Sequence, residues 1–172
     1  MILPSYRRVP IPQSFTESRF LGRLTNSSAL AASVAPLVAA HMEPTEFYRA
    51  QAGDGAIRRL ARRVGRIDQL ARVVRADLAG RPPLAADSPE CEWLLERAQV
   101  LEVADRAPVP ILKGRHLVQL GLPPGPRYRE ILDAVYEAQL EGQVLDVATG
   151  MAHAATVVGP LEWPASAARM QA

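Results

Sequence analysis

Apolar residues recur every three or four positions over much of this chain, which is the spacing of helices with one buried face. The clearest case lies just before Gly65. Its apolar positions are Ile57, Leu60, Ala61 and Val64. They share one face of a helix, for which Asp54 is a suitable N-terminal cap and Gly65 a suitable residue at the end. The pattern predicts an amphipathic helix that begins at Asp54 and ends before Gly65, and it favours a cap over a nucleotide-binding loop at Asp54.

The same spacing, together with capping residues and proline breaks, predicts five further helices. They cover residues 27–42, 67–79, 89–103, 115–120 and 127–141. The first contains Pro36, which predicts a kink or a boundary. No segment worth assigning as a strand alternates apolar and polar residues with a period of two. The chain is therefore predicted to be all-α, an irregular helical bundle of about six to seven helices.

Proline and glycine divide this pattern into four parts. Residues 1–19 contain three prolines and are expected to form an extended arm. Residues 20–83 are predicted to form a first helical subdomain with the basic helix, and residues 84–145 a second. A linker rich in glycine and proline over residues 80–89 separates them. Residues 146–172 are mostly small, apolar and weakly charged, and are expected to be a flexible tail.

The composition is that of a globular protein, with 48% hydrophobic and 22% charged residues. Cys91 is the single cysteine, so no intramolecular disulfide can form, and a reducing, cytoplasmic location is expected. No apolar run approaches the length that a membrane span requires, so we expect no membrane partner.

Charge is distributed unevenly along the chain. The net charge is only +2, yet residues 49–81 hold nine arginines against three aspartates, a net of +6. Residues 87–105 hold six acidic residues against Arg97, a net of −5. Such an asymmetry fits either a surface that faces a polyanion or pairing between the two segments.

The residue types that usually carry catalysis are not arranged for it. There is no Asp-x-Asp pair to hold magnesium and no His-Asp dipeptide, and Cys91 has no second cysteine for a zinc site. The three histidines lie far apart in the sequence. We therefore expect no catalytic residues, no metal and no cofactor, and a stand-alone enzyme is the least favoured class.

An arginine cluster is the strongest positive feature. It consists of Arg58, Arg59, Arg62, Arg63 and Arg66. These side chains spread over the face of the predicted helix opposite the apolar one. Guanidinium groups match the geometry of phosphate oxygens, so this face could bind nucleic acid. A solvated face, whose last arginines complement the helix dipole, fits the same pattern.

A second basic group surrounds a turn rich in glycine and proline. Its candidate residues are Lys113, Arg115, Gly121, Gly125 and Arg127. Backbone N–H groups of such a turn, and of the helix that follows, can bind a phosphate. Ordinary turn chemistry explains the glycines and prolines equally simply. The acidic residues of the last helix are interpreted as a solvated face.

Three stretches closely resemble one protein family. They are Pro110–Leu117 (PILKGRHL), Leu120–Tyr128 (LGLPPGPRY) and Ile131–Gly142 (ILDAVYEAQLEG). Together with Ala56–Gly65 and Ala76–Pro83, they are similar to the C-terminal body and tail of bacterial tRNA nucleotidyltransferases, the CCA-adding enzyme and poly(A) polymerase family. The resemblance covers about residues 20 to 145. At one position it fails, because Arg129 follows the tyrosine where the family tends to have glycine.

The resemblance implies an all-helical body and tail that hold tRNA, while a separate N-terminal head adds nucleotides. No catalytic residue of that head has a counterpart in this chain. We therefore expect a non-catalytic, truncated paralogue that binds tRNA or another structured RNA through the two basic groups. The alternatives are a helical interaction subunit, docking on a separately encoded nucleotidyltransferase head or on itself, and a stable relic without a role.

Overall fold

The computed structural model describes residues 27–80 and 88–159, and every regular element in these two ranges is an α-helix. The predicted all-α fold is confirmed. The helices are α2 (Ser28–Ala40), α3 (Glu43–Ala50), α4 (Asp54–Val64), α5 (Ile67–Ala79), α6 (Pro89–Val100), α7 (Gly114–Gln119), α8 (Arg127–Leu140) and α9 (Val147–Val158). The arm expected over residues 1–19 lies outside the described residues. No described helix is long and apolar enough to cross a membrane.

All six predicted helices are present, with small shifts at their ends, and α3 and α9 are additional. Helix α2 continues through Pro36, because this helix also contains alanine and leucine, which favour helical backbone. Helix α3 begins beside Pro44, a residue suited to the first turn of a helix. It had no apolar periodicity strong enough to predict it.

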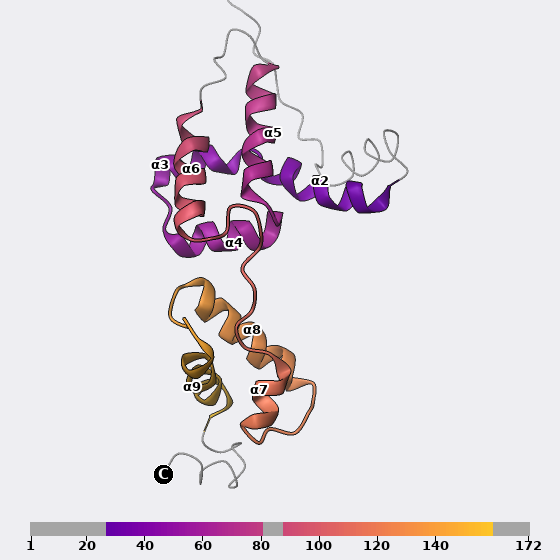
Figure 1. Ribbon diagram of the computed structural model, residues 1–172, viewed down its shortest axis with the longest axis vertical. Helices are drawn as coiled ribbons and strands as arrows, with labels where there is room; N and C mark the ends of the chain where they lie inside the picture. The colour runs from indigo at the N-terminus through magenta and orange to yellow at the C-terminus, as the bar shows by residue number, and fades with distance from the viewer. Residues whose placement is uncertain (1–26, 81–87, 160–172) are drawn as a thin grey trace, which may run out of the picture.

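Helices α2 to α6 surround one hydrophobic core. Figure 1 shows them gathered at one end of an elongated molecule. The fully buried side chains of this core include Ile57, Leu60, Ile67, Leu70 and Leu94. The edges of the core are tied by ion pairs from Arg75 to Glu92 and from Arg97 to Asp54. Both pairs join the basic and the acidic segments, as one interpretation of the charge asymmetry expected.

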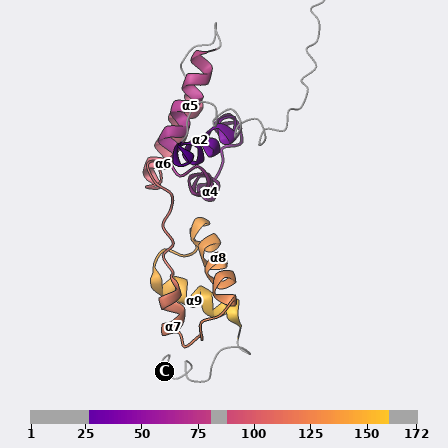
Figure 2. The same ribbon diagram turned by 90° about the vertical axis from the view of Figure 1, so that its right-hand side faces the viewer.

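Helices α7 to α9 surround a second core at the other end (Figures 1 and 2). Its buried residues include Leu112, Leu117, Ile131, Val135 and Val144. Helix α9 packs on α8, and its Gly150 is buried with Leu112 and Val144 methyl groups 3.4 Å from where a Cβ would lie. The flexible tail expected from residue 146 onward is therefore wrong over Val147–Val158. Residues 160–172 lie outside the described residues.

The two cores divide the chain at a different place from the linker that the sequence indicated. Helix α6, expected in the second subdomain, packs on α3, α4 and α5 of the first. The first core ends at Val103 and the second begins at Leu112. The boundary that the sequence indicated at residues 80–89 therefore falls within the first helical group, between α5 and α6.

The segment between the cores is bonded to both of them. Ala104 O accepts a hydrogen bond from the Asp68 backbone N–H at 3.0 Å, on the side of the first core. On the side of the second core, Tyr136 Oη donates to Pro108 O at 2.6 Å. Gln139 donates to Val109 O at 2.9 Å. Residues 105–107 are the stretch between these two sets of bonds.

Candidate nucleic-acid interface

Helix α4 presents the arginine cluster. Its capping residue is Gly53, with extended backbone, and not Asp54 as the sequence suggested, because Asp54 is already the first helical residue. Gly65 ends the helix with a φ of 77°, a left-handed conformation that glycine adopts without strain. The predicted apolar face is buried in the first core, which leaves the arginines on the remaining surface. Four of them (Arg59, Arg62, Arg63 and Arg66) expose between 42% and 57% of their side chains, and Arg58 is half-buried.

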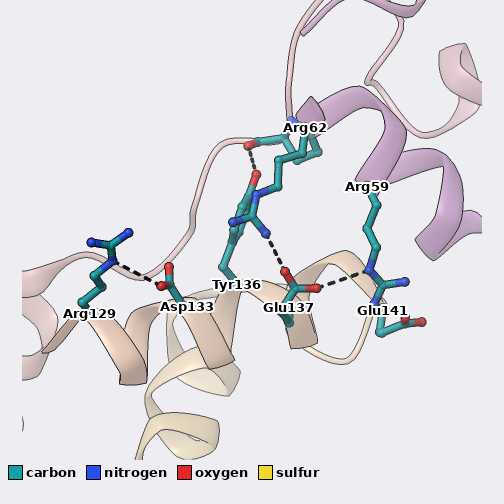
Figure 3. A network of polar contacts seen from close by, with 8 residues as sticks. Arg59, Arg62, Arg129, Asp133, Tyr136, Glu137 and Glu141 are labelled. Carbon is teal, nitrogen blue, oxygen red and sulfur yellow. Dashed lines mark hydrogen bonds and ion pairs between the residues drawn. The ribbon is translucent and has the colours of Figure 1, made fainter. Parts of the chain in front are cut away.

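Two of these arginines reach across to α8 of the second core. Arg59 Nε donates to Glu137 Oε2 at 3.2 Å, and its terminal nitrogen pairs with Glu141. Arg62 donates to the other oxygen of Glu137 at 2.5 Å. Figure 3 shows both guanidinium groups directed at these carboxylates. The hydrogen bonds that Arg59 donates to Glu141 and Glu137 raise its pKa above the ordinary value.

Further contacts complete this junction. The Arg62 guanidinium carbon lies 4.6 Å from the centre of the Tyr136 ring, a cation–π geometry. Arg58 donates to the carbonyl of Leu140 at 3.1 Å, in the last turn of α8, where carbonyl groups lack helical partners. Burial raises the pKa of the Tyr136 hydroxyl.

The remaining arginines of the cluster pair within the first helical group. Arg63 pairs with Glu43 of α3, and Arg66 donates to Asp68 at 2.6 Å. The Asp68 carboxylate raises the pKa of Arg66, and the guanidinium in turn lowers the pKa of Asp68. Each arginine of the cluster thus already contacts a protein oxygen, while four of the five remain about half exposed to solvent.

The sequence interpretation missed the partners on α8. It took the acidic residues there as a solvated face. Glu137 and Glu141 are indeed about half exposed, but they also pair with α4, whereas Asp133 pairs with Arg129 at 3.7 Å on α8 itself. The available signal was that Glu137 and Glu141 lie one helical turn apart and so share a face. Nothing in the sequence alone showed that this face meets α4.

The second basic group lies around the turn before α8. Gly121 has a φ of 81°, so glycine is needed there. Tyr128 Oη donates to Leu122 O at 2.5 Å, which fastens the turn to the first turn of α8. Lys113 caps α7, and Arg115 Nε lies 3.3 Å from the imidazole of the buried His116.

A pocket of about 360 Å³ opens beside this turn. Its lining is mostly apolar and comprises Leu122, Pro123, Pro124, Gly125, Pro126, Arg127, Tyr128, Ile131 and Val158. Gly125 and Arg127 of the predicted set thus lie at this pocket.

The structure does not bring the two basic groups together. The arginine cluster contacts the C-terminal end of α8, and the turn lies at its N-terminal end. A helix of 14 residues is about 20 Å long, so the groups are separated by roughly that distance along α8. Among the described residues, no group of three or more metal-ligating side chains converges. A ligand that contacts both basic groups must be extended.

Comparisons with known proteins place these residues in a wider context. The chain is similar to a tRNA nucleotidyltransferase. It is 33% identical over 133 residues to the A-adding tRNA nucleotidyltransferase of Deinococcus radiodurans, a match that covers 74% of this chain and 30% of that enzyme. No family model and no solved structure matches.

The extent of this similarity bears on both basic groups. A continuous stretch that covers 74% of 172 residues must include the middle of the chain, so α4 and the turn before α8 both lie within the matched region. The chain spans about 30% of the length of its relative. The similarity agrees with the family resemblance of the sequence motifs.

Proposed function

We propose that this protein binds structured RNA, with tRNA as the first candidate, and that it does so without catalysis. The observation that carries the proposal is the similarity to an enzyme whose name states that it acts on tRNA, over a region that includes both basic groups.

The chemistry of the two groups suits phosphate rather than base recognition. Arginine forks bind phosphate oxygens in pairs, and four of the α4 arginines are about half exposed. Aromatic residues form only 5% of the chain, so there are few rings on which bases could stack. The separation of about 20 Å along α8 means that an RNA must span at least this distance to contact both groups.

The test is fluorescence anisotropy of labelled tRNA at several salt concentrations, beside duplex DNA of similar length. We expect tRNA to bind more tightly than DNA, with the logarithm of affinity falling by about 0.7 to 0.9 per neutralised phosphate for each tenfold rise in salt. Absence of binding to tRNA at low salt would refute the proposal.

A matched pair of variants then locates the site. Arg58, Arg62 and Arg66 changed together to alanine should weaken tRNA binding about tenfold or more and flatten the salt dependence. Arg49, Arg72 and Arg75 changed to alanine remove the same charge from positions outside both groups and should have a much smaller effect. Equal losses in the two triple variants would show that α4 is not the site. Circular dichroism confirms that both remain helical.

One observation favours the alternative function, a subunit that docks on another protein. Leu30 at the start of α2 and Met42 just beyond its end expose 51% and 52% of their surface. Exposed apolar residues mark a protein contact when they belong to a contiguous patch, which this alternative requires along α2. Under this alternative, the protein purifies with a nucleotidyltransferase head and binds tRNA only when that head is present.

A further inference from the structure

The contact between the two helical groups differs from the contacts within each of them. Each group has its own cluster of buried apolar residues, and no described residue belongs to both. Where α4 meets α8, the contact is made mainly by charged and polar atoms: Arg58 bonds to a carbonyl, and Arg59 and Arg62 pair with Glu137 and Glu141. The aromatic ring of Tyr136 also lies at this contact, where it faces the Arg62 guanidinium. The junction therefore depends on electrostatic attraction far more than on apolar burial.

Such attraction is weak when the charges are exposed. The side chains of Arg59, Arg62, Glu137 and Glu141 are 42% to 49% exposed. Exposed ion pairs contribute little to stability and are screened by salt. In contrast, a nucleic acid backbone offers a row of phosphates, and arginines that bind it gain further from the release of condensed counterions. Phosphates can therefore displace these carboxylates.

The chain between the groups has a defined pivot. Ala104 is bonded to the first group through Asp68, and Pro108 and Val109 are bonded to α8. Residues 105–107 lie between these anchors without a helix. If the α4–α8 contact opened, the two groups could reorient about these three residues without breaking either core.

We propose that the α4–α8 contact is an ionic latch. In the free protein, Glu137 and Glu141 hold Arg59 and Arg62. When RNA binds, its phosphates replace the two carboxylates, and the helical groups turn about residues 105–107. This inference rests on the proposed function, since it names how the same arginines change partner. The glutamates thus act as an internal competitor that lowers the affinity for RNA.

The opening is measured as a distance by Förster transfer in the full chain. Dyes are placed at Ala76→Cys on α5 and Ala152→Cys on α9, two positions in different groups, with the buried Cys91 changed to alanine. The distance should change on adding tRNA or inorganic polyphosphate at constant ionic strength. If a probe that binds at saturation leaves the distance unchanged, the latch is overturned.

Two variants of α8 separate the latch from a general effect of charge. Glu137→Gln with Glu141→Gln removes the competitor, and Glu130→Gln with Asp133→Asn removes two charges from the same helix away from α4. The Glu137→Gln, Glu141→Gln variant should bind tRNA about five- to tenfold more tightly than the Glu130→Gln, Asp133→Asn variant. Before RNA is added, it should already show the distance that the wild type reaches when RNA binds. Equal affinities in the two variants would contradict the latch.

The failures of the two proposals are distinguishable. If tRNA does not bind but polyphosphate changes the distance in the wild type and not in the Glu137→Gln, Glu141→Gln variant, the latch stands and the RNA function fails. If tRNA binds with unchanged distance and the two α8 variants behave alike, the RNA function stands and the latch is refuted.

Discussion

Arg59 Nε lies 3.2 Å from Glu137 Oε2, although the two residues are 78 positions apart in the chain. This contact crosses the boundary between the two hydrophobic cores. Helix α4 thus has two roles. Its apolar face builds the first core, and its polar face holds the second group in place through α8. The arginines proposed to bind phosphate are therefore also the structural link between the two helical groups.

The separate cores predict that a cavity in one group destabilises mainly that group. Leu70 and Leu117 are fully buried, one in each core. Leu70→Ala or Leu117→Ala should lower the free energy of unfolding of its own core by about 2–5 kcal/mol. Hydrogen exchange should show faster exchange in α2–α6 for the first variant and in α7–α9 for the second.

The control is Val118→Ala. Val118 lies on the same short helix as Leu117, but 53% of its surface is exposed. This control should leave exchange nearly unchanged. Uniformly faster exchange over both groups in the Leu70→Ala and Leu117→Ala variants would instead show that the chain unfolds as one cooperative unit.

A helix could be predicted from the sequence only where its own residues carry strong signals, such as an apolar face or a capping residue. Helix α4 was predicted with its ends because it has a strong apolar face and a terminal glycine. Helix α9 was missed because glycine, threonine and valine favour helix weakly. Its stability comes from packing, since the buried Gly150 lets it approach Leu112 and Val144 closely. A capping box at Asp146 and Thr149 was the one local signal for it.

Only one side of the candidate site, the arginines of α4, could be predicted from the sequence. The arginines were visible as a cluster, since their spacing on a helix follows from the sequence. Their partners were not, because Glu137 and Glu141 belong to another helix and meet α4 only through the path of the chain at residues 104–111. Charge asymmetry indicated that pairing was an option without identifying which residues would pair.

Alkaline pH should weaken the attachment of the connecting segment through Tyr136. Its hydroxyl donates to Pro108 O, and burial raises its pKa. An unfolded tyrosine ionises near pH 10. The contribution to stability is therefore complete below about pH 10 and is lost as the pH rises through the higher pKa of the folded state. Urea unfolding at pH 8 to 11 measures this loss.

The control is Tyr136→Phe, which keeps the ring beside Arg62 and removes the titrating group. It should be less stable than the wild type at pH 8 by about 1–2 kcal/mol, because the Pro108 carbonyl loses its donor. The difference between the two proteins should shrink above pH 10. A constant difference across this range would contradict the assigned role of the hydroxyl.

Two glycines at the junction should respond oppositely to alanine. Gly142 has a φ of 80°, so Gly142→Ala is strained and should destabilise the fold by about 1–2 kcal/mol. Gly55 lies in the first turn of α4, where a Cβ would be 2.7 Å from the Glu141 carboxylate. That carboxylate ends a flexible side chain and can move. Gly55→Ala should therefore raise helix stability by up to about 1 kcal/mol while displacing Glu141.

Thermal unfolding distinguishes the two variants. Gly80→Ala serves as a comparison, because the φ of Gly80 is −75° and a Cβ added there would lie at ordinary contact distance from its neighbours. Only Gly142→Ala should lower the melting temperature. A lowered melting temperature for Gly55→Ala would mean that the Arg59–Glu141 pair stabilises the fold more than an exposed pair is expected to.

Asp146 should make the stability of α9 depend on acid pH. Its carboxylate accepts a hydrogen bond from the Thr149 backbone N–H at 2.7 Å, and this bond lowers the pKa of Asp146. The unfolded value is about 3.9. The stabilisation is therefore present above about pH 4 and is lost as the pH falls through the lower pKa of the folded state.

At pH 7, Asp146→Ala should lower the urea midpoint, whereas Asp146→Asn should lower it less, because asparagine also caps helices well. The difference between the wild type and Asp146→Ala should diminish below pH 4. A difference that persists unchanged at pH 2 would show that the cap acts through its shape rather than its charge.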